Sequence, residues 1–467
     1  MANVLLVEPE YRSKFPPLGL MRLSTYHKKL GDHVSFVRGK NPEMQRVNWD
    51  RVYVSSLFTY ELPRTVETAS YYRSCVDRPD DLVVGGTAAT LLPDYVFARV
   101  DCRVVKGLID KRGLLAPDSP PIDTLVPDYT LLEAVEYDYC PADSYFCRVT
   151  KGCIRKCSFC AVPVLEPSFG YRMSVSDQLR EVDAKHGPRR NLVLMDNNIL
   201  ATKGLEGVIE DIVMAGFGRG SEQGGKGRTV DFNQGIDARL VTRRTAQLLR
   251  TLALSPVRLA FDSLEIEKPY VVAIRRLAEV GFSDFTNYVM FNCEDDPPSF
   301  YYRLRLNADL SEELGVRISS FPMKFVPIDD ITRGNIGACW TWRYLRGIQC
   351  VLLATHGVVS PNPTFFRAAF GESLEEFLEI LSMPDRYIIY RETHRDGGAK
   401  EWLREFHALS SQEKLEFLEL LALLRHTPNK RSIGQTAKHR SLLSHYYPED
   451  FGVGEEWFEQ EYLIPGS

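Results

Sequence analysis

The chain of 467 residues lacks the features that mark several large protein classes. No apolar stretch approaches the ~18 residues that a membrane-spanning helix needs. Residues 1–8 carry no basic segment of the kind that opens a signal peptide. The net charge is −5, so the chain as a whole lacks the positive excess that is typical of nucleic-acid-binding proteins. We therefore predict a cytoplasmic protein without a membrane partner.

Cysteine is scarce, with ten residues in the whole chain. That number in a chain of this length does not indicate a disulfide framework and favours a reducing compartment. Three of the ten nevertheless stand together, because Cys153, Cys157 and Cys160 form a C-x3-C-x2-C motif. No C-x2-C pair occurs after Cys160, so a fourth thiolate is missing at short range.

This group of three thiolates favours an iron–sulfur cluster with one open site. Structural zinc sites and ordinary iron–sulfur sites take four protein ligands. A [4Fe–4S] cube held by only three cysteines leaves its fourth iron open to a small molecule. The alternatives are three idle thiols and a zinc finger, for which the chain has no partner motif.

The first third of the chain alternates short apolar runs with helical patterns. The runs predict strands over residues 3–8, 33–37, 51–57, 81–84 and 100–106. Such alternation implies parallel βαβ units, so we predict a doubly wound, Rossmann-like domain over residues 1–112. These sheets bind ligands at the carboxyl ends of their strands, where Ser55-Ser56 and Gly85-Gly86-Thr87 lie here. Tight turns without a ligand are the alternative.

Residues 113–144 contain five prolines and are predicted as a linker. Alternation resumes over residues 145–329, the second predicted domain. It predicts six strands, at 145–149, 191–195, 229–232, 257–261, 285–291 and 316–321. Six strands are too few to close an eight-stranded barrel. We therefore predict an α/β protein with a partial (β/α)6 barrel, with the cysteines after its first strand, and a mostly helical C-terminal domain over residues 330–467.

The cysteine motif resembles the signature of the radical S-adenosylmethionine (radical SAM) superfamily, including the aromatic Phe159 just before the last cysteine. The resemblance implies that Cys153, Cys157 and Cys160 hold a [4Fe–4S] cluster, and that SAM binds its open iron beside Phe159. It also implies reductive cleavage of SAM to a 5′-deoxyadenosyl radical, which abstracts hydrogen from a substrate. A one-electron reductant such as flavodoxin or ferredoxin is the partner that this chemistry requires.

A second resemblance concerns the N-terminal third. Pro16-Pro17-Leu18-Gly19, Ser55-Ser56 and Val83-Val84-Gly85-Gly86 together are similar to the cobalamin-binding domain of one radical SAM subclass. The cobalamin-ligand motif of that domain, D-x-H-x-x-G, is absent, because Glu8-Pro-Glu-Tyr-Arg-Ser-Lys occupies its place. The resemblance thus implies cobalamin as a further cofactor without a histidine ligand from that motif. Some members of the subclass bind it in this way and others have lost it.

Polar residues at the strand ends are the candidate site, because barrel chemistry takes place at the carboxyl ends of the strands. Asp196 and Asn197 follow the second predicted strand. Radical SAM enzymes place the residues that hold the amino group of SAM there, so the resemblance assigns both to SAM. A carboxylate beside an ammonium group is favourable. The alternative is a turn in which these side chains bond their own backbone.

The third predicted strand leads into a polar segment that contains Gln234 and Arg239. Both are candidate catalytic residues, with Arg239 as a bidentate clamp for the carboxylate of SAM or of the substrate. The alternative is a pair between Asp237 and Arg239 that only stiffens the loop.

Two further strand ends supply the remaining candidates. Asp262 and Ser263 are candidates for the ribose hydroxyls of SAM. Asn292 is a candidate contact to the same cofactor. Cys293 is a candidate hydrogen donor to a substrate radical, as cysteines are in some members of the superfamily, and a plain buried thiol is the alternative.

A stretch near the C-terminus, between Glu419 and Glu449, has no acidic residue and holds five cations: Arg425, Lys430, Arg431, Lys438 and Arg440. It favours a solvated basic face, and contact with a phosphate-bearing substrate or nucleic acid is the alternative. The leading interpretation of the chain is a radical SAM enzyme with an unidentified substrate. A cobalamin-dependent radical SAM methyltransferase, and a non-catalytic iron–sulfur or nucleic-acid-binding protein on this scaffold, are the alternatives.

Overall fold

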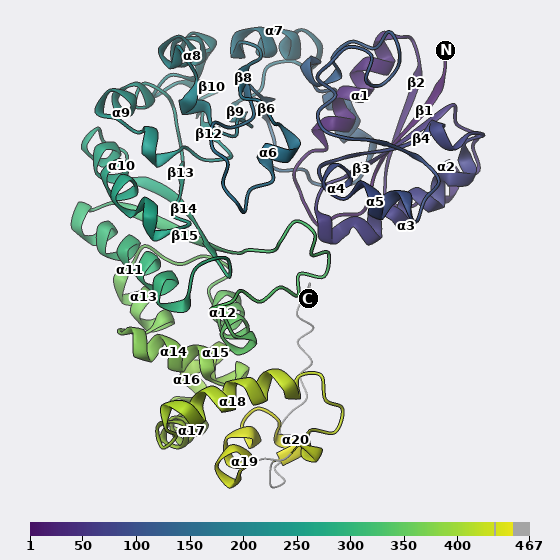
Figure 1. Cartoon of the computed structure of the whole chain (residues 1–467). Coiled ribbons are helices and arrows are strands. Elements are labelled where there is room, and N and C mark those ends of the chain that lie inside the picture. The colour runs from purple at the N-terminus through teal and green to yellow at the C-terminus, as the bar shows by residue number, and fades with distance from the viewer. Residues whose placement is uncertain (434–435, 452–467) are drawn as a thin grey trace. The chain divides into compact units, whose positions relative to one another are not determined.

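The computed structural model describes residues 1–433 and 436–451, which form two compact units (Figure 1). The first unit comprises Met1–Tyr288, Leu314–Arg317 and Phe325–Asn335. The second comprises Val289–Glu313, Ile318–Lys324 and the described residues after Asn335. Among the described residues, none of the helices combines the length and the apolar character needed to cross a lipid bilayer. The predicted domain boundaries at residues 112, 144 and 329 remain predictions.

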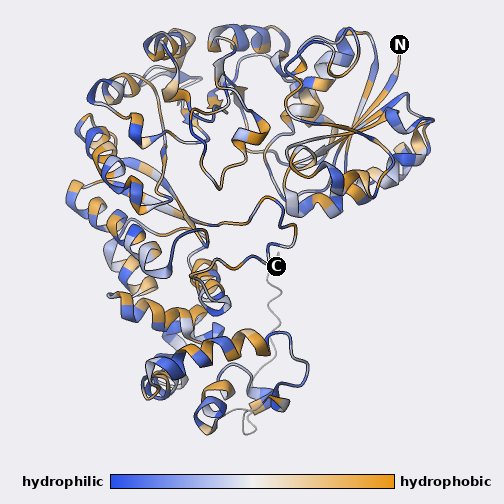
Figure 2. Cartoon of the chain, viewed as in Figure 1, coloured by the Kyte–Doolittle hydropathy of each residue, from blue (hydrophilic) through white to orange (hydrophobic). Residues whose placement is uncertain are grey.

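The N-terminal part of the first unit is a parallel sheet of five strands in the order β2-β1-β3-β4-β5. The strands are β1 (Asn3–Glu8), β2 (His33–Arg38), β3 (Arg51–Ser56), β4 (Leu82–Gly86) and β5 (Arg103–Val105). Val4 to Val7 of β1 are fully buried, as expected for a parallel sheet that is covered on both faces, and its strands are strongly apolar (Figure 2). The chain leaves β1 for β2 on one side and returns to β3 on the other, and this order places a crevice at the carboxyl ends of β1 and β3.

Helices cover this sheet, and the predicted linker follows it. The helices are α1 (Leu18–Lys29), α2 (Pro42–Gln45), α3 (Leu62–Tyr72), α4 (Thr87–Leu91) and α5 (Pro93–Phe97). Leu62, Ala69 and Tyr72 of α3 belong to the buried core of the sheet. The proline-rich residues after β5 form only two short 3-10 turns before residue 144, Ile122–Thr124 and Tyr129–Ala134.

Strands and helices alternate again from residue 144 and form two sheets, in the orders β12-β9-β6 and β13-β14-β15. The strands are β6 (Ser144–Cys147), β9 (Asn191–Leu194), β12 (Val230–Phe232), β13 (Val257–Ala260), β14 (Asp284–Phe291) and β15 (Arg317–Lys324). The helices between them are α7 (Val175–His186), α8 (Leu205–Ile212), α9 (Arg243–Leu249), α10 (Glu267–Glu279) and α11 (Pro297–Leu314). β6, β9 and β12 are parallel, as are β13 and β14. The prediction of a mixed α/β fold with parallel sheets is confirmed.

Short elements surround the cysteine motif. Strands β7 (Thr150–Lys151) and β8 (Gly170–Tyr171) pair antiparallel on either side of it, and α6 (Val162–Leu165) begins two residues after Cys160. A Cβ atom on Gly152 would lie 2.4 Å from the carbonyl oxygen of Ser168, and its φ is +69°. Only glycine fits there. A second small hairpin pairs β10 (Glu222–Gln223) with β11 (Lys226–Gly227).

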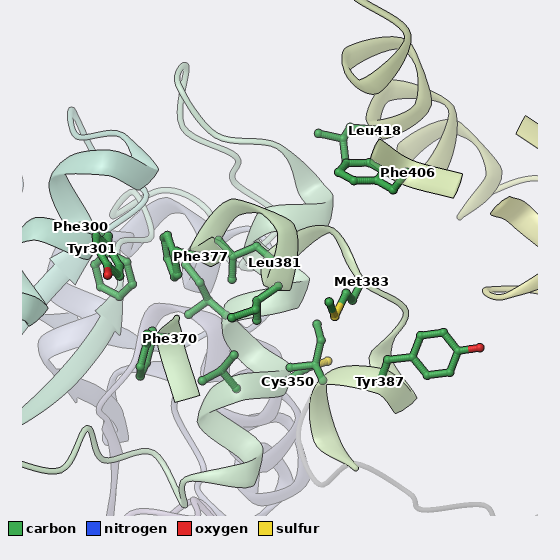
Figure 3. Close-up of a cluster of buried hydrophobic side chains, with 14 of the residues drawn as sticks. Phe300, Tyr301, Cys350, Phe370, Phe377, Leu381, Met383, Tyr387, Phe406 and Leu418 are labelled. Atoms are coloured by element: carbon green, nitrogen blue, oxygen red, sulfur yellow. The ribbon is translucent and has the colours of Figure 1, made fainter. Parts of the chain in front are cut away.

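The second unit has an aromatic core. Tyr301 of α11 stacks on Phe377 with ring centroids 5.0 Å apart, and Phe300, Phe370 and Leu381 join the same buried cluster (Figure 3). Helices supply most of it: α12 (Trp342–Ala354), α13 (Pro363–Phe370), α14 (Leu374–Ser382), α15 (Asp385–Ile389), α16 (Arg391–His394), α17 (Gly398–His407), α18 (Ser411–Leu424), α19 (Ala437–Ser444) and α20 (Pro448–Phe451). The predicted helical character of the C-terminal region is confirmed over the described residues.

The basic stretch of this unit is engaged in contacts within the unit itself. The ammonium group of Lys438 lies 2.9 Å from Glu413, and the guanidinium group of Arg425 lies over the ring of Trp342. Arg431 donates to backbone carbonyls at residues 449 and 450, and Lys430 lies 3.7 Å from the Asp450 carboxylate. These contacts favour the solvated, self-paired basic face over a nucleic-acid surface.

Candidate functional site

Cys153, Cys157 and Cys160 lie on the cluster loop, defined here as residues 152–161, in the first unit. All three thiols are partly exposed. The backbone N–H of Arg155 donates to the Sγ of Cys153 at 3.3 Å, and that of Val162 donates to the Sγ of Cys160 at 3.5 Å. Burial, together with the nearby Cys157 and Cys153 thiols, raises the pKa of the Cys160 thiol.

Whether this loop fits a cluster depends on its donor atoms. Among the described residues, no three His, Cys, Asp or Glu side chains converge in the geometry of a metal site. The donor set itself, three thiols with N–H donors aimed at two of them, has the chemistry of a three-cysteine iron–sulfur site. The assignment of the three cysteines as metal ligands therefore remains a prediction, and the chemistry of these residues fits it.

Asp237 fastens the cluster loop to the segment after β12. Its carboxylate accepts the Nε–H of Arg155 at 2.8 Å and the Nε–H of Arg239 at 2.6 Å. Asn198 donates its amide to the same carboxylate at 3.3 Å and to the Sγ of Cys153 at 3.4 Å. Burial opposes ionisation of Asp237, but hydrogen bonds from the two arginines outweigh it and lower the pKa of this carboxyl. The Asp237–Arg239 pair thus exists and stiffens the loop, and the Nη groups of Arg239 remain for a further ligand.

Asp196 is buried and holds the segment between β6 and the cluster loop. Its Oδ1 accepts the backbone N–H of Thr150 at 2.5 Å, the hydroxyl of Thr150 at 2.6 Å and the backbone N–H of Val149 at 3.1 Å. Burial raises the pKa of this carboxyl, although these bonds oppose the shift. The neighbouring Asn197 donates its amide to Glu166 at 3.1 Å. Assignment of both residues to SAM remains a prediction.

The other candidates of the first unit lie at the strand ends. Asp262 is near enough to raise the pKa of the Cys160 thiol, after burial and the other two thiols. Ser263 caps the turn after it by accepting the N–H of Glu265. Gln234 is exposed and donates to Asn233 at 3.1 Å, and Phe159 is half-buried. The structure thus gathers Asp262 with the cysteines and leaves the roles of Ser263, Gln234 and Phe159 as predictions.

Asn292 and Cys293 belong to the second unit. Asn292 is fully buried with a φ of +70°, and its side-chain oxygen accepts the N–H of Gly337 at 2.7 Å. Cys293 is partly exposed, and its backbone N–H donates to Asp295 at 3.0 Å. Both residues shape a loop in that unit, and their predicted roles at SAM and at a substrate radical stay predictions.

A cavity of about 280 Å³ opens at the carboxyl ends of β3 and β4 and is called here the N-terminal cavity. Its lining includes residues from the segments that the sequence predicted to approach a ligand or that resemble a cobalamin-binding domain: Gly19, Ser55, Gly85, Gly86 and Thr87. A Cβ atom on Gly19 would meet no protein atom within 4 Å, so the backbone of α1 leaves open space there. Among the described residues that line the cavity, none is a histidine. His27 is buried and bonds Asp32 and Tyr53 instead.

Solved structures share the fold of this chain, although no protein-family profile and no curated protein sequence matches it. The radical S-adenosylmethionine methyltransferase TsrM from Kitasatospora setae, solved with cobalamin and a [4Fe-4S] cluster bound, matches at 16% identity and a TM-score of 0.51, over 69% of this chain and 74% of its own. The cobalamin-dependent S-adenosylmethionine radical enzyme OxsB, solved with aqua-cobalamin and SAM bound, matches at 12% identity and a TM-score of 0.50, over 97% and 77%. The chain has the fold of cobalamin-dependent radical SAM enzymes. The predicted resemblance is confirmed at the level of the fold.

Within this radical SAM fold, several residues at the site were not predicted. Arg155 and Asn198 contact the cysteine segment, and Arg148 pairs with Glu166. Asn198 directly follows the predicted pair Asp196-Asn197, so its position after a predicted strand could have identified it. Glu166 lies in no motif, and its contacts come from segments that are separate in sequence.

Proposed function

We propose that the protein is a radical SAM enzyme built as a partial six-stranded barrel behind a Rossmann-like domain. The observation that carries the proposal is the position of the C-x3-C-x2-C motif in a chain with this fold. The motif lies between β6, the first strand of the predicted barrel, and β9, the second. Cys153, Cys157 and Cys160 would hold the [4Fe–4S] cluster, which when bound supplies the electron for reductive cleavage of SAM.

The residues around the motif have roles that follow from their contacts. Asp237 holds Arg155 and Arg239 near the thiols, and the Nη groups of Arg239 suit the carboxylate of SAM or of a substrate. Asn197 supplies an amide after β9, and Asp262 supplies a carboxylate after β13. The carboxylate of Asp196 accepts the backbone N–H groups of Val149 and Thr150. Asp196 therefore acts by holding the backbone of these two residues in place.

The test is anaerobic reconstitution followed by incubation with SAM and dithionite. We expect about four irons per chain and the release of 5′-deoxyadenosine. Cys157→Ala should lose both. Cys339→Ala, which removes an exposed thiol outside the motif, should keep both. Well-folded wild-type protein that neither takes up iron nor cleaves SAM would contradict the proposal.

A second candidate is cobalamin-dependent methyl transfer, which the N-terminal cavity favours. Its floor is apolar and partly bare backbone, at Gly19 and Gly85, which suits one face of a flat macrocycle. The described residues of its lining offer no imidazole, so the corrinoid would bind without a histidine ligand from these residues. Micromolar binding of hydroxocobalamin and formation of S-adenosylhomocysteine are expected. Absence of binding in folded protein would remove this candidate and leave the radical SAM proposal in place.

A further inference from the structure

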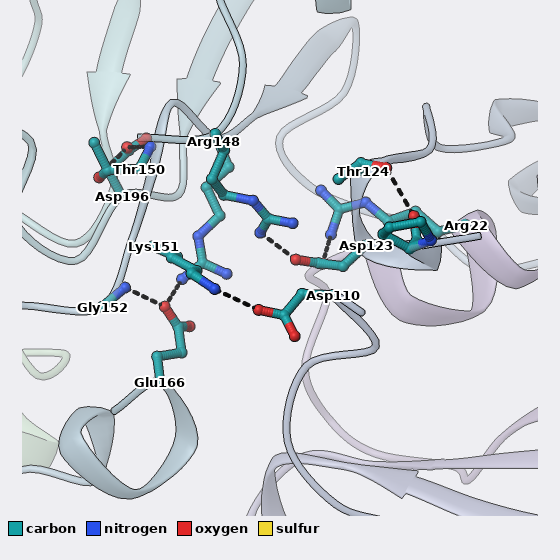
Figure 4. Close-up of polar contacts among 12 residues, drawn as sticks. Arg22, Asp110, Asp123, Thr124, Arg148, Thr150, Lys151, Gly152, Glu166 and Asp196 are labelled. Carbon is teal, nitrogen blue, oxygen red and sulfur yellow. Dashed lines mark hydrogen bonds and ion pairs between the residues drawn. The ribbon is translucent and has the colours of Figure 1, made fainter. Parts of the chain in front are cut away.

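One carboxylate oxygen of Glu166 accepts hydrogen bonds from three residues. It directly follows α6, six residues after Cys160. Its Oε2 accepts the N–H of Gly152 at 2.6 Å and a guanidinium N–H of Arg148 (Figure 4). The same oxygen accepts the side-chain amide N–H of Asn197 at 3.1 Å. The side chain is 10% exposed. A buried carboxylate with three charge-assisted or backbone donors holds those donors in fixed places.

One of these donors is the first residue of the cluster loop. Gly152 immediately precedes Cys153, and its backbone fits against Ser168 without room for a side chain. The preceding residue is fixed as well, because the ammonium group of Lys151 lies 2.6 Å from Asp110 (Figure 4). The path of the chain into the cysteine motif therefore depends on the carboxylates of Glu166 and Asp110.

The same groups form part of the wall of the N-terminal cavity. Arg148, Leu165 and Glu166 line it together with Arg22 and Asp123. Asp123 lies 2.6 Å from Arg22 (Figure 4). It also pairs with Arg172, which directly follows β8. Burial opposes ionisation of Asp123, but the arginines outweigh it and lower its pKa. The Arg148–Glu166 pair and the Arg22–Asp123–Arg172 group therefore both contribute to the cavity wall, and Arg148 acts electrostatically on Asp123.

We propose that Glu166 is a positioning residue that couples occupancy of the N-terminal cavity to the order of the cluster loop. The ligand class is a corrinoid, so the inference rests on the proposed cobalamin site and deepens it. A ligand packed against Arg148, Leu165 and Glu166 restricts the motion of this wall. Because Glu166 accepts the N–H of Gly152, the motion of the cluster loop is then restricted as well. Without the carboxylate, the wall and the loop move independently.

The test is hydrogen exchange in cluster-free protein, which needs no catalytic turnover. Hydroxocobalamin should slow amide exchange over residues 150–166 of the wild type by about tenfold, a typical coupling between sites. In Glu166→Gln, measured at a hydroxocobalamin concentration that saturates the variant, the slowing should fall below about twofold. Arg148→Gln, which removes the cavity-side donor, should show the same loss of slowing and serves if Glu166→Gln fails to fold.

The matched control is Glu181→Gln, because Glu181 is an exposed carboxylate of α7. It should keep the full slowing. Equal slowing in wild type, Glu166→Gln and Arg148→Gln overturns the coupling and leaves the cobalamin site standing. Failure of folded wild-type protein to bind hydroxocobalamin overturns the coupling together with the cobalamin assignment, while SAM cleavage measured separately reports on the radical SAM proposal.

Discussion

The Asp237 carboxylate lies 2.8 Å from the Nε of Arg155, although the two residues are 82 positions apart in the sequence. Arg155 stands between Cys153 and Cys157, so this ion pair ties the middle of the cysteine motif to the loop after β12. The side chain of Asp237 is only 6% exposed. Its charge therefore matters more than that of a surface carboxylate.

Asp237→Asn should loosen the cluster loop. The substitution weakens the hydrogen bonds to Arg155 and Arg239, and we expect a loss of about 2 kcal/mol in the free energy of unfolding. Iron should also leave the reconstituted protein faster when a chelator is added. Glu206→Gln, which breaks the exposed pair with Arg244, should cost less than about 0.5 kcal/mol. Equal effects of the two substitutions in urea titrations would contradict the role of Asp237.

Gly19→Leu should block the N-terminal cavity without harming the fold. Gly19 lies in the first turn of α1 and lines the cavity, and a Cβ atom added to it would have no protein atom nearby. Leucine is a good helix former, so stability should not fall. Hydroxocobalamin binding, followed by its visible spectrum, should weaken at least about tenfold because the side chain occupies the ligand's space.

The control for that experiment is Gly207→Leu. Gly207 also lies in a helix, α8, also has open space where a Cβ atom would stand, and is exposed away from the cavity lining. Its substitution should leave binding unchanged. Loss of binding in both variants, or in neither, would argue against the cavity as the ligand site.

Gly86→Ala should disrupt the strand end that borders the cavity. Its φ is +100°, and a Cβ atom would lie 2.3 Å from the carbonyl oxygen of Ser56. We expect a loss of about 3 kcal/mol, measured by urea unfolding, because the backbone of β3 or β4 must move. Gly85→Ala places its Cβ atom 3.6 Å from Val105 and should be tolerated. A similar loss in both variants would show that the positive φ is not the cause.

Glu8 should make stability depend on pH. Burial raises the pKa of its carboxyl from an ordinary 4.5 to about 7, although Tyr139 and Arg38 oppose the shift. A raised pKa in the folded state favours the protonated form, so the stabilising contribution is complete below about pH 4.5 and is lost as the pH rises through about 7. Between about pH 5 and about pH 8 the loss should be about 2.5 kcal/mol. Glu8→Gln, which cannot ionise, should remove this part of the slope in urea titrations, and an unchanged slope would contradict the prediction.

Local patterns in the sequence predicted much of the fold. The buried runs at β1, β3 and β4 lie within a residue or two of their predicted positions, because apolar runs and their glycine ends are local signals. Ser174 caps α7 by accepting the N–H of Asp177, three residues later, which is a local pattern of the same kind. Helix α8 ends at Ile212, and the chain continues as an irregular turn in which Gly216 has a φ of +87°.

The site was less accessible to such reasoning. The cysteine motif is one contiguous pattern, and Arg239 and Asp196 follow predicted strands. Glu166 has no motif, because it is defined by donors from Arg148, Gly152 and Asn197 that meet only after the strands have packed. Single-sequence patterns contain no information on such meetings between distant segments. For Asp196, the sequence predicted the position at the end of a strand. It did not predict the three hydrogen bonds to Val149 and Thr150.

The aromatic core of the second unit also determines how late in translation this unit can complete its packing. Phe300 and Tyr301 share that core with Leu442 and Leu443, which follow about 140 residues later in the chain. At ~5–20 residues per second, the ribosome needs on the order of 10 s to complete this core after α11 itself has been made. During that interval the core lacks its last helices, so we expect some of its apolar side chains to stay exposed in the nascent chain until α19 has been made.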